Sequence, residues 1–171
     1  GGIASSADGQ ILYAVQVAND IGNAGWIYIT TDNGTTWTQI TGTENLSGGG
    51  WNSVACSADG EKAIASQDGV GGVYVSPFAG SEWYRTSLPN ATWTSVATSS
   101  SGTVFLATAL SDYIYLSRDY GVTWVPQMDP GTGPWSVAGV SPDGATFMVG
   151  QSNGTIDTNG TNWPFITNIV G

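Results

Sequence analysis

The chain has 171 residues, which is long enough for one domain with a sizeable core, and only 9% of them are charged. Three Lys and Arg residues stand against thirteen Asp and Glu residues, so the net charge of −10 excludes nucleic-acid binding through a basic face. With no His and one cysteine, Cys56, most thiolate or imidazole metal sites and Ser-His-Asp catalysis are also excluded. The 40% hydrophobic content predicts a folded chain, and no apolar run approaches the roughly 20 residues of a membrane span.

Short runs of β-branched and aromatic residues, bounded by Gly, Asp, Asn and Ser, predict strands along the whole chain, and no helical periodicity is present. They fall into four groups of four. The predicted strands are 3–5, 11–17, 26–30 and 37–41; then 53–56, 62–66, 73–76 and 83–86; then 95–98, 104–109, 113–117 and 124–126; and finally 136–140, 146–150, 155–156 and 163–167.

A short motif ending in Gly recurs once in each group, between the first and second predicted strands. Its glycines, Gly9, Gly60, Gly102 and Gly144, are spaced by 51, 42 and 42 residues. Four strands per unit of about 42 residues is the spacing of β-propeller blades, which bury their faces against one another. We therefore predict an all-β propeller, a single domain of four antiparallel blades at about 1–47, 48–90, 91–133 and 134–171.

A second motif, the octapeptide Ser/Thr-x-Asp-x-Gly-x-Thr-Trp, lies between the third and fourth strands of each unit, and each copy is called a box here. Boxes 30–37 and 117–124 are complete, whereas boxes 76–83 and 156–163 are degenerate, with Phe78 and Thr158 in place of the Asp. At this spacing the motif resembles the Asp-box, or BNR repeat, of sialidase-like propellers. The matching residues are Thr30, Asp32, Gly34, Thr36, Trp37, Ser117, Asp119, Gly121, Thr123 and Trp124.

The resemblance implies a structural role for the boxes. In that family the box is a hairpin, its Asp accepts hydrogen bonds from the turn, its Gly adopts a conformation unfavourable to a side chain, and its Trp packs between blades. The blades with Phe78 and Thr158 are therefore expected to hold their turns in another way and to be distorted.

The resemblance does not extend to a sialidase active site, which needs three arginines. This chain has only Arg85 and Arg118. Related propellers hydrolyse neutral polysaccharides with two carboxylates, which here would come from the predicted loops. The candidates are Asp20, Asp68, Asp112, Glu44 and Asp129. Because these loops are short, we expect no enzyme activity and no catalytic residues, and a glycoside hydrolase is the second alternative.

Three tryptophans, Trp51, Trp93 and Trp135, precede the first strand of the second, third and fourth units. They are candidate stacking platforms for sugar rings, which gives a glycan-binding lectin as the first alternative function. The structural interpretation is that they pack against the neighbouring blade. Asp20, Asp68, Asp112 and Asn153 recur at equivalent loop positions and would form a weak calcium site if they met, although solvated turns are expected, so no metal or other cofactor is predicted.

Five Asn-x-Ser/Thr sequons, at Asn33, Asn45, Asn90, Asn153 and Asn159, favour a secreted, N-glycosylated protein over simple turn chemistry. The first residues, Gly1-Gly2-Ile3, suggest a segment cut from a longer chain or array. Either the four blades close on themselves or they form a slice of a larger propeller or polymer. The predicted function is a non-catalytic extracellular module that interacts with another protein or assembles with itself as a filament or oligomer.

Overall fold

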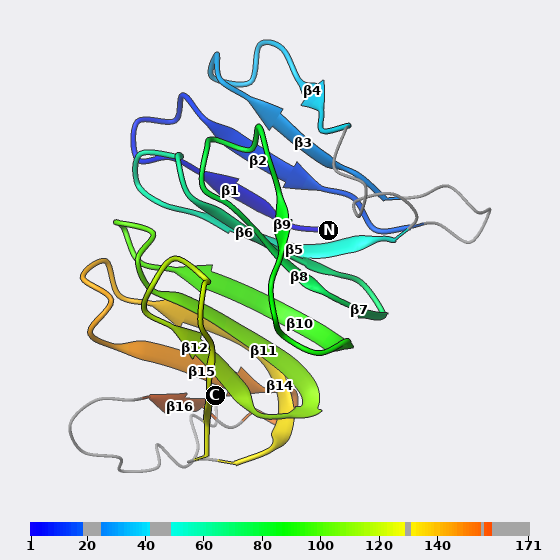
Figure 1. Ribbon diagram of the computed structural model, residues 1–171, viewed down its shortest axis with the longest axis vertical. Coiled ribbons are helices and arrows are strands. Elements are labelled where there is room, and N and C mark those ends of the chain that lie inside the picture. Colours follow the sequence, from blue (N-terminus) through cyan, green and yellow to red (C-terminus); the bar gives the residue numbers. More distant parts are fainter. Residues whose placement is uncertain (19–24, 42–48, 129–130, 155, 159–171) are drawn as a thin grey trace.

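The computed structural model describes residues 1–18, 25–41, 49–128, 131–154 and 156–158, and every regular element among them is a β-strand. The strands of the four predicted units form four successive blades (Figure 1). In chain order they are β1 (Ile3–Ser5), β2 (Leu12–Val15), β3 (Ile27–Thr30) and β4 (Thr38–Gln39); β5 (Trp51–Cys56), β6 (Ala63–Gln67), β7 (Val70–Gly71), β8 (Val73–Ser76) and β9 (Tyr84–Arg85); β10 (Ala91–Thr98), β11 (Phe105–Asp112), β12 (Ile114–Ser117) and β13 (Val125–Gln127); and β14 (Gly133–Val140), β15 (Phe147–Gln151) and β16 (Ile156–Thr158).

The blades are antiparallel, as predicted, with the pairing order β1-β2-β3-β4 repeated as β5-β6-β8-β9 and β10-β11-β12-β13. The described part of the fourth blade has the order β14-β15-β16. No helix in the described part of the chain is long and apolar enough to cross a membrane.

Backbone hydrogen bonds join each blade to the next at two levels. The turns between the first and second strands form a ladder, in which the N–H groups of Ala7, Ala58 and Ser100 donate to the carbonyls of Ala58, Ser100 and Pro142, at 2.7 to 2.9 Å. At the other ends of these strands, β7 of the second blade pairs with β10 of the third, and β11 pairs with β14. The sequence analysis predicted neither β7 nor this pairing between blades.

Three separate apolar cores lie between the blades. Tyr13, Ile64 and Leu106, at equivalent positions of β2, β6 and β11, are each fully buried against the following blade. In β6, β11 and β15 the residue before this position points the opposite way, so Ala63, Phe105 and Phe147 are buried against the preceding blade. This alternation is the period of two of a strand buried on both faces.

The blades form an open arc, with the first and fourth at opposite ends of the stack (Figure 1). The inner strands and their turns line a hollow of about 270 Å³ that includes Ala7, Ala58, Ser100 and Pro142. Such a hollow is the counterpart of the central channel of a propeller.

Candidate interaction surfaces

The complete boxes are hairpin turns held together by their Asp side chains. Asp32 accepts hydrogen bonds from the Thr30 hydroxyl at 2.7 Å, the Thr36 backbone N–H at 2.8 Å and the Thr36 hydroxyl at 2.6 Å. Asp119 accepts the equivalent three bonds from Ser117 and Thr123. The hydrogen bonds from Thr36 and Thr30 lower the pKa of Asp32 to about 2, and those from Thr123 and Ser117 also lower the pKa of Asp119. These carboxylates are committed to their own turns.

The degenerate second box keeps the same turn without an Asp. The Gly80 N–H donates to the Ser76 hydroxyl at 3.0 Å, as Gly34 does to Thr30, and Ser81 donates from both its N–H and its hydroxyl to the Phe78 carbonyl. The register of β6 with β8 is unbroken. The expectation of a distorted second blade is therefore wrong, because the backbone and hydroxyl bonds that the complete first box also makes hold this turn without the carboxylate.

The fourth box is a second correction. Ile156 pairs with Gly150, and Ile27 pairs with Val15, the residue equivalent to Gly150. Ile156 therefore occupies the first position of the third strand, three residues before the position that a box would require. The alignment of residues 156–163 as a box is wrong, because the chain is still in the strand at residues 156–158. Residues 159–163 lie outside the described residues.

The box tryptophans pack against the preceding blade where the chain provides one. Trp83 is 4% exposed and contacts the core between the first two blades, and Trp124 packs against the core between the second and third. Trp37, in the first blade, is 45% exposed.

The candidate sugar platforms Trp51, Trp93 and Trp135 are 0 to 1% exposed and lie in three different cores. Trp51 and Trp93 meet Tyr74 and Tyr115 edge to face. These positions favour the packing interpretation and leave no open indole face for a sugar ring. Each of the three lies in the core between its own blade and the preceding one, so they do not share one site.

The candidate acidic loop residues make local hydrogen bonds. Asp68 accepts from the Gly69 N–H, and Asp112 accepts from the Tyr113 N–H and from the Tyr115 hydroxyl. Asn153 donates to Gln151. Among the described residues no group of three or more His, Cys, Asp or Glu side chains is arranged to hold a metal ion. The other three candidate carboxylates, Asp20, Glu44 and Asp129, lie outside the described residues.

The described sequon residues Asn33, Asn90 and Asn153 are exposed, and Asn45 and Asn159 lie outside the described residues. Cys56 is unpaired, and its burial raises the pKa of the thiol to about 11, which makes a thiolate nucleophile at neutral pH unfavourable.

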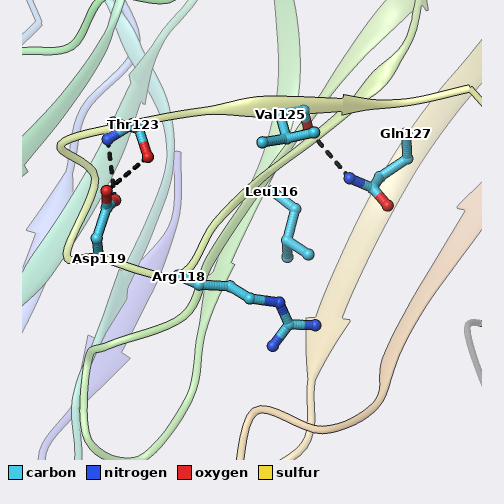
Figure 2. Close-up of a pocket in the computed structure, with 6 residues that line it drawn as sticks. All are labelled: Leu116, Arg118, Asp119, Thr123, Val125 and Gln127. Carbon is cyan, nitrogen blue, oxygen red and sulfur yellow. Dashed lines mark hydrogen bonds between the residues drawn. The ribbon is translucent and has the colours of Figure 1, made fainter.

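The hollow shown in Figure 2 has a volume of about 340 Å³ and lies on β12 and β13. Both Asp119 oxygens accept hydrogen bonds from Thr123, and Arg118 donates to the Gly144 carbonyl of the next blade. The charged groups that line this hollow are therefore engaged in hydrogen bonds that hold the box turn and join two blades.

The sequence analysis missed a serine that holds the turn between the first and second strands of every blade, called the inner turn. Its hydroxyl accepts from the backbone N–H five residues later, and in three blades it donates to an Asp. These serines are Ser6, Ser57, Ser99 and Ser141. Their recurrence two residues before each Asp-Gly or Ser-Gly pair was a signal that could have found them.

The two outer faces of the arc each carry an apolar hollow. The first blade's outer face, called the leading face, has a hollow of about 380 Å³ lined by Ile3, Leu12 and Trp37. The fourth blade's outer face, called the trailing face, has a hollow of about 200 Å³ lined by Val137, Met148 and Ile156. Ile3 is 85% exposed, Val137 is 59% exposed and Met148 is 53% exposed.

Neither a family model nor a curated protein matches the chain. Solved structures do match. A GH74 enzyme of Niastella koreensis superimposes with a TM-score of 0.70 and 24% identity over 98% of this chain and 24% of its own. YCF48 bound to the D1 peptide superimposes with a TM-score of 0.65 and 18% identity, over 94% of this chain and 49% of its own. The C-terminal WD40 domain of Sif2 superimposes with a TM-score of 0.64 and 13% identity, over 92% of this chain and 44% of its own. The chain thus spans a quarter to a half of these structures.

These similarities and the stacked four-stranded sheets define the class: the chain has an all-β propeller fold. The low identities establish the fold alone.

Proposed function

We propose that the chain is a non-catalytic, extracellular interaction module of the Asp-box type, which binds protein through the two outer faces of its arc. The observation that carries this proposal is the exposure of Ile3 and Met148, whose equivalents Val54 and Ile64 inside the arc are buried, together with the exposure of Trp37 and Val137 on the same two outer faces. Exposed apolar surfaces of this kind mark interaction sites. The hydrogen bonding of the two complete boxes supports the relationship to Asp-box propellers.

The lectin alternative loses its platforms, since Trp51, Trp93 and Trp135 are buried. The hydrolase alternative has only the likeness to GH74 enzymes, at 24% identity or less. The described candidate carboxylates, Asp68 and Asp112, engage in local hydrogen bonds and do not form a catalytic pair. Protein interaction is therefore the function that these side chains support best.

The test is site-specific photo-cross-linking in native extracellular material. Ile3 or Met148 is replaced by p-benzoylphenylalanine, and Val70, which is 75% exposed on β7 of an inner blade, serves as the matched control position. We expect cross-linked protein, identified by mass spectrometry, from positions 3 and 148 and not from position 70. Equal cross-linking at all three positions, or cross-linking at none of them, would overturn the proposal. Binding on a glycan array would then favour the lectin alternative.

A further inference from the structure

A seam is the contact between two neighbouring blades. In every blade the leading side faces the preceding blade and the trailing side faces the following blade, so the seams inside the arc show what each side binds. At every seam a residue equivalent to Tyr13 on the trailing side meets a residue equivalent to Ala63 on the leading side. At the first seam the box Trp of the leading side, Trp83, adds an edge-to-face contact with Tyr13. A trailing face is thus always covered by a leading face.

The free faces are the two halves of one more such seam. Met148 is the equivalent of Tyr13, Ile64 and Leu106, because all four pair with the third strand in the same register. Ile3 is the equivalent of Val54 and Val96, which are 6% and 5% exposed at the inner seams. Leu12 and Trp37 complete the leading face.

Building on the proposed function, we infer that the partner is a second copy of this chain, docked head to tail. The trailing face of each copy covers the leading face of the other, and two copies close into a ring of eight blades. The contact continues the interface that the chain already makes three times within itself.

The chemistry of the two faces fits this partner. Their hollows are lined by uncharged residues, Ile3, Leu12 and Trp37 on one side and Val137, Met148 and Ile156 on the other. Burial of such surface is favourable by about 25 cal/mol per Å² before the cost of association. No inner seam pairs two leading or two trailing faces, so a symmetric contact of one face with itself has no precedent in the chain.

The number of blades favours closure at two copies. Propellers close with four to eight blades, and the four blades of this chain form an open arc, so two copies supply eight. A head-to-tail contact that keeps the rotation between blades then closes instead of extending.

The test uses complementary variants of the purified chain. Ile3→Asp blocks the leading face and Met148→Asp blocks the trailing face; both side chains are more than half exposed, so the fold is expected to remain, which circular dichroism checks. By sedimentation velocity we expect wild type at twice the monomer mass and each variant alone as a monomer. Mixing the variants is expected to restore a 1:1 dimer, because one seam is then intact. Its dissociation constant should be at least tenfold weaker than that of wild type.

Val70→Asp, an equally exposed strand position on an inner blade, is the control and is expected to remain a dimer. Three results would overturn the inference: a monomeric wild type, a dimer of either variant alone, or fibres in place of a ring. A monomeric wild type whose positions 3 and 148 still cross-link to a different protein would leave the proposed function standing. Loss of both kinds of contact would remove it.

Discussion

Tyr13 of the first blade and Trp83 of the second meet edge to face across the first seam, with ring centroids 6.3 Å apart and ring planes at 87°. Tyr13 also donates a hydrogen bond from its hydroxyl to the Gly60 carbonyl at 2.8 Å. One box tryptophan thus locks one blade to the blade before it. Trp37 occupies the same box position and has no preceding blade among the described residues.

Replacing Trp83 should therefore affect the stability of the monomer, and replacing Trp37 should affect its self-association. Trp83→Ala removes a buried side chain from the first seam and is expected to lower the free energy of unfolding by about 3–5 kcal/mol. Trp37→Ala should change the unfolding of the monomer by less than about 1 kcal/mol and weaken self-association instead. Urea unfolding at protein concentrations below those at which the chain associates measures the first effect, and sedimentation measures the second. Equal losses of monomer stability would contradict the open leading face.

Acid should unfold the protein through its turn carboxylates. Hydrogen bonds from neighbouring hydroxyl and N–H groups lower the pKa of five of them, Asp8, Asp32, Asp59, Asp119 and Asp143. A lowered folded-state pKa contributes stability above the unfolded pKa of about 3.9 that is lost as pH falls through the folded value. For Asp32 that value is about 2.

We therefore expect the urea midpoint to be flat from about pH 7 to pH 5 and to fall between about pH 4 and pH 2. The double variant Asp32→Asn/Asp119→Asn should show a shallower fall, because two of the five carboxylates no longer titrate. An unchanged pH profile in that variant would show that the boxes do not contribute to acid stability.

The box glycines test the packing of each blade against the one before it. Gly34 and Gly121 have φ values of +85° and +83°, so alanine strains both by about 1 kcal/mol. At Gly121 a Cβ would lie 2.8 Å from Val75 of the preceding blade, whereas at Gly34 the nearest atom, Leu12 Cδ1, is 3.6 Å away. Gly121→Ala should cost a further 1–3 kcal/mol or so, through overpacking. Urea unfolding of the two variants compares these costs, and equal values would contradict the difference in packing.

Much of this fold was predictable from the sequence, because the evidence for it is local. The repeated Asp-Gly turns and the alternation of apolar residues predicted the blades and placed the strands 3–5 and 73–76 at their observed bounds. The earlier starts of β5, β10 and β14 could not be predicted. In β10 and β14 those residues are strands because they pair with the loop end of the preceding blade, as Ala91 does with Gly71. In β5 the added residue Trp51 pairs with Gln67 of its own blade.

The binding surface was less predictable for the same reason. Composition selected Trp51, Trp93 and Trp135, since aromatic residues suit sugars, but burial depends on the neighbouring blade. Met148 and Ile3 are ordinary core positions in every other blade. Only their place at the ends of an open arc exposes them, and that is a property of the tertiary structure.

Glycosylation is tested by mass. Asn33 and Asn90 are exposed and belong to intact sequons, so native secreted material is expected to exceed the polypeptide mass of 17.6 kDa by one or more glycans. Intact-mass spectrometry before and after enzymatic removal of N-glycans measures this. A native mass equal to that of the bare chain would remove the sequon support for a secretory origin.

Pro142 distinguishes the seam between copies from the seams within the chain. In the ladder of inner turns the N–H of one blade donates to the carbonyl of the next, and Pro142, at the last position, has no N–H to offer to Ala7 of a second copy. Pro142→Ala supplies that donor at both seams of the ring. At roughly 0.5–1.5 kcal/mol for each of the two hydrogen bonds, it should tighten dimerisation by about 5- to 150-fold.

The same substitution should slightly destabilise the monomer, by about 0.4–1 kcal/mol, because alanine leaves more freedom to the unfolded chain than proline does. Pro126→Ala, in β13 of the third blade, carries a comparable entropic cost without a seam and is the control for it. Sedimentation equilibrium and urea unfolding of both variants separate the two effects. Tighter dimerisation in Pro126→Ala, or none in Pro142→Ala, would show that the ladder of inner turns does not continue between copies.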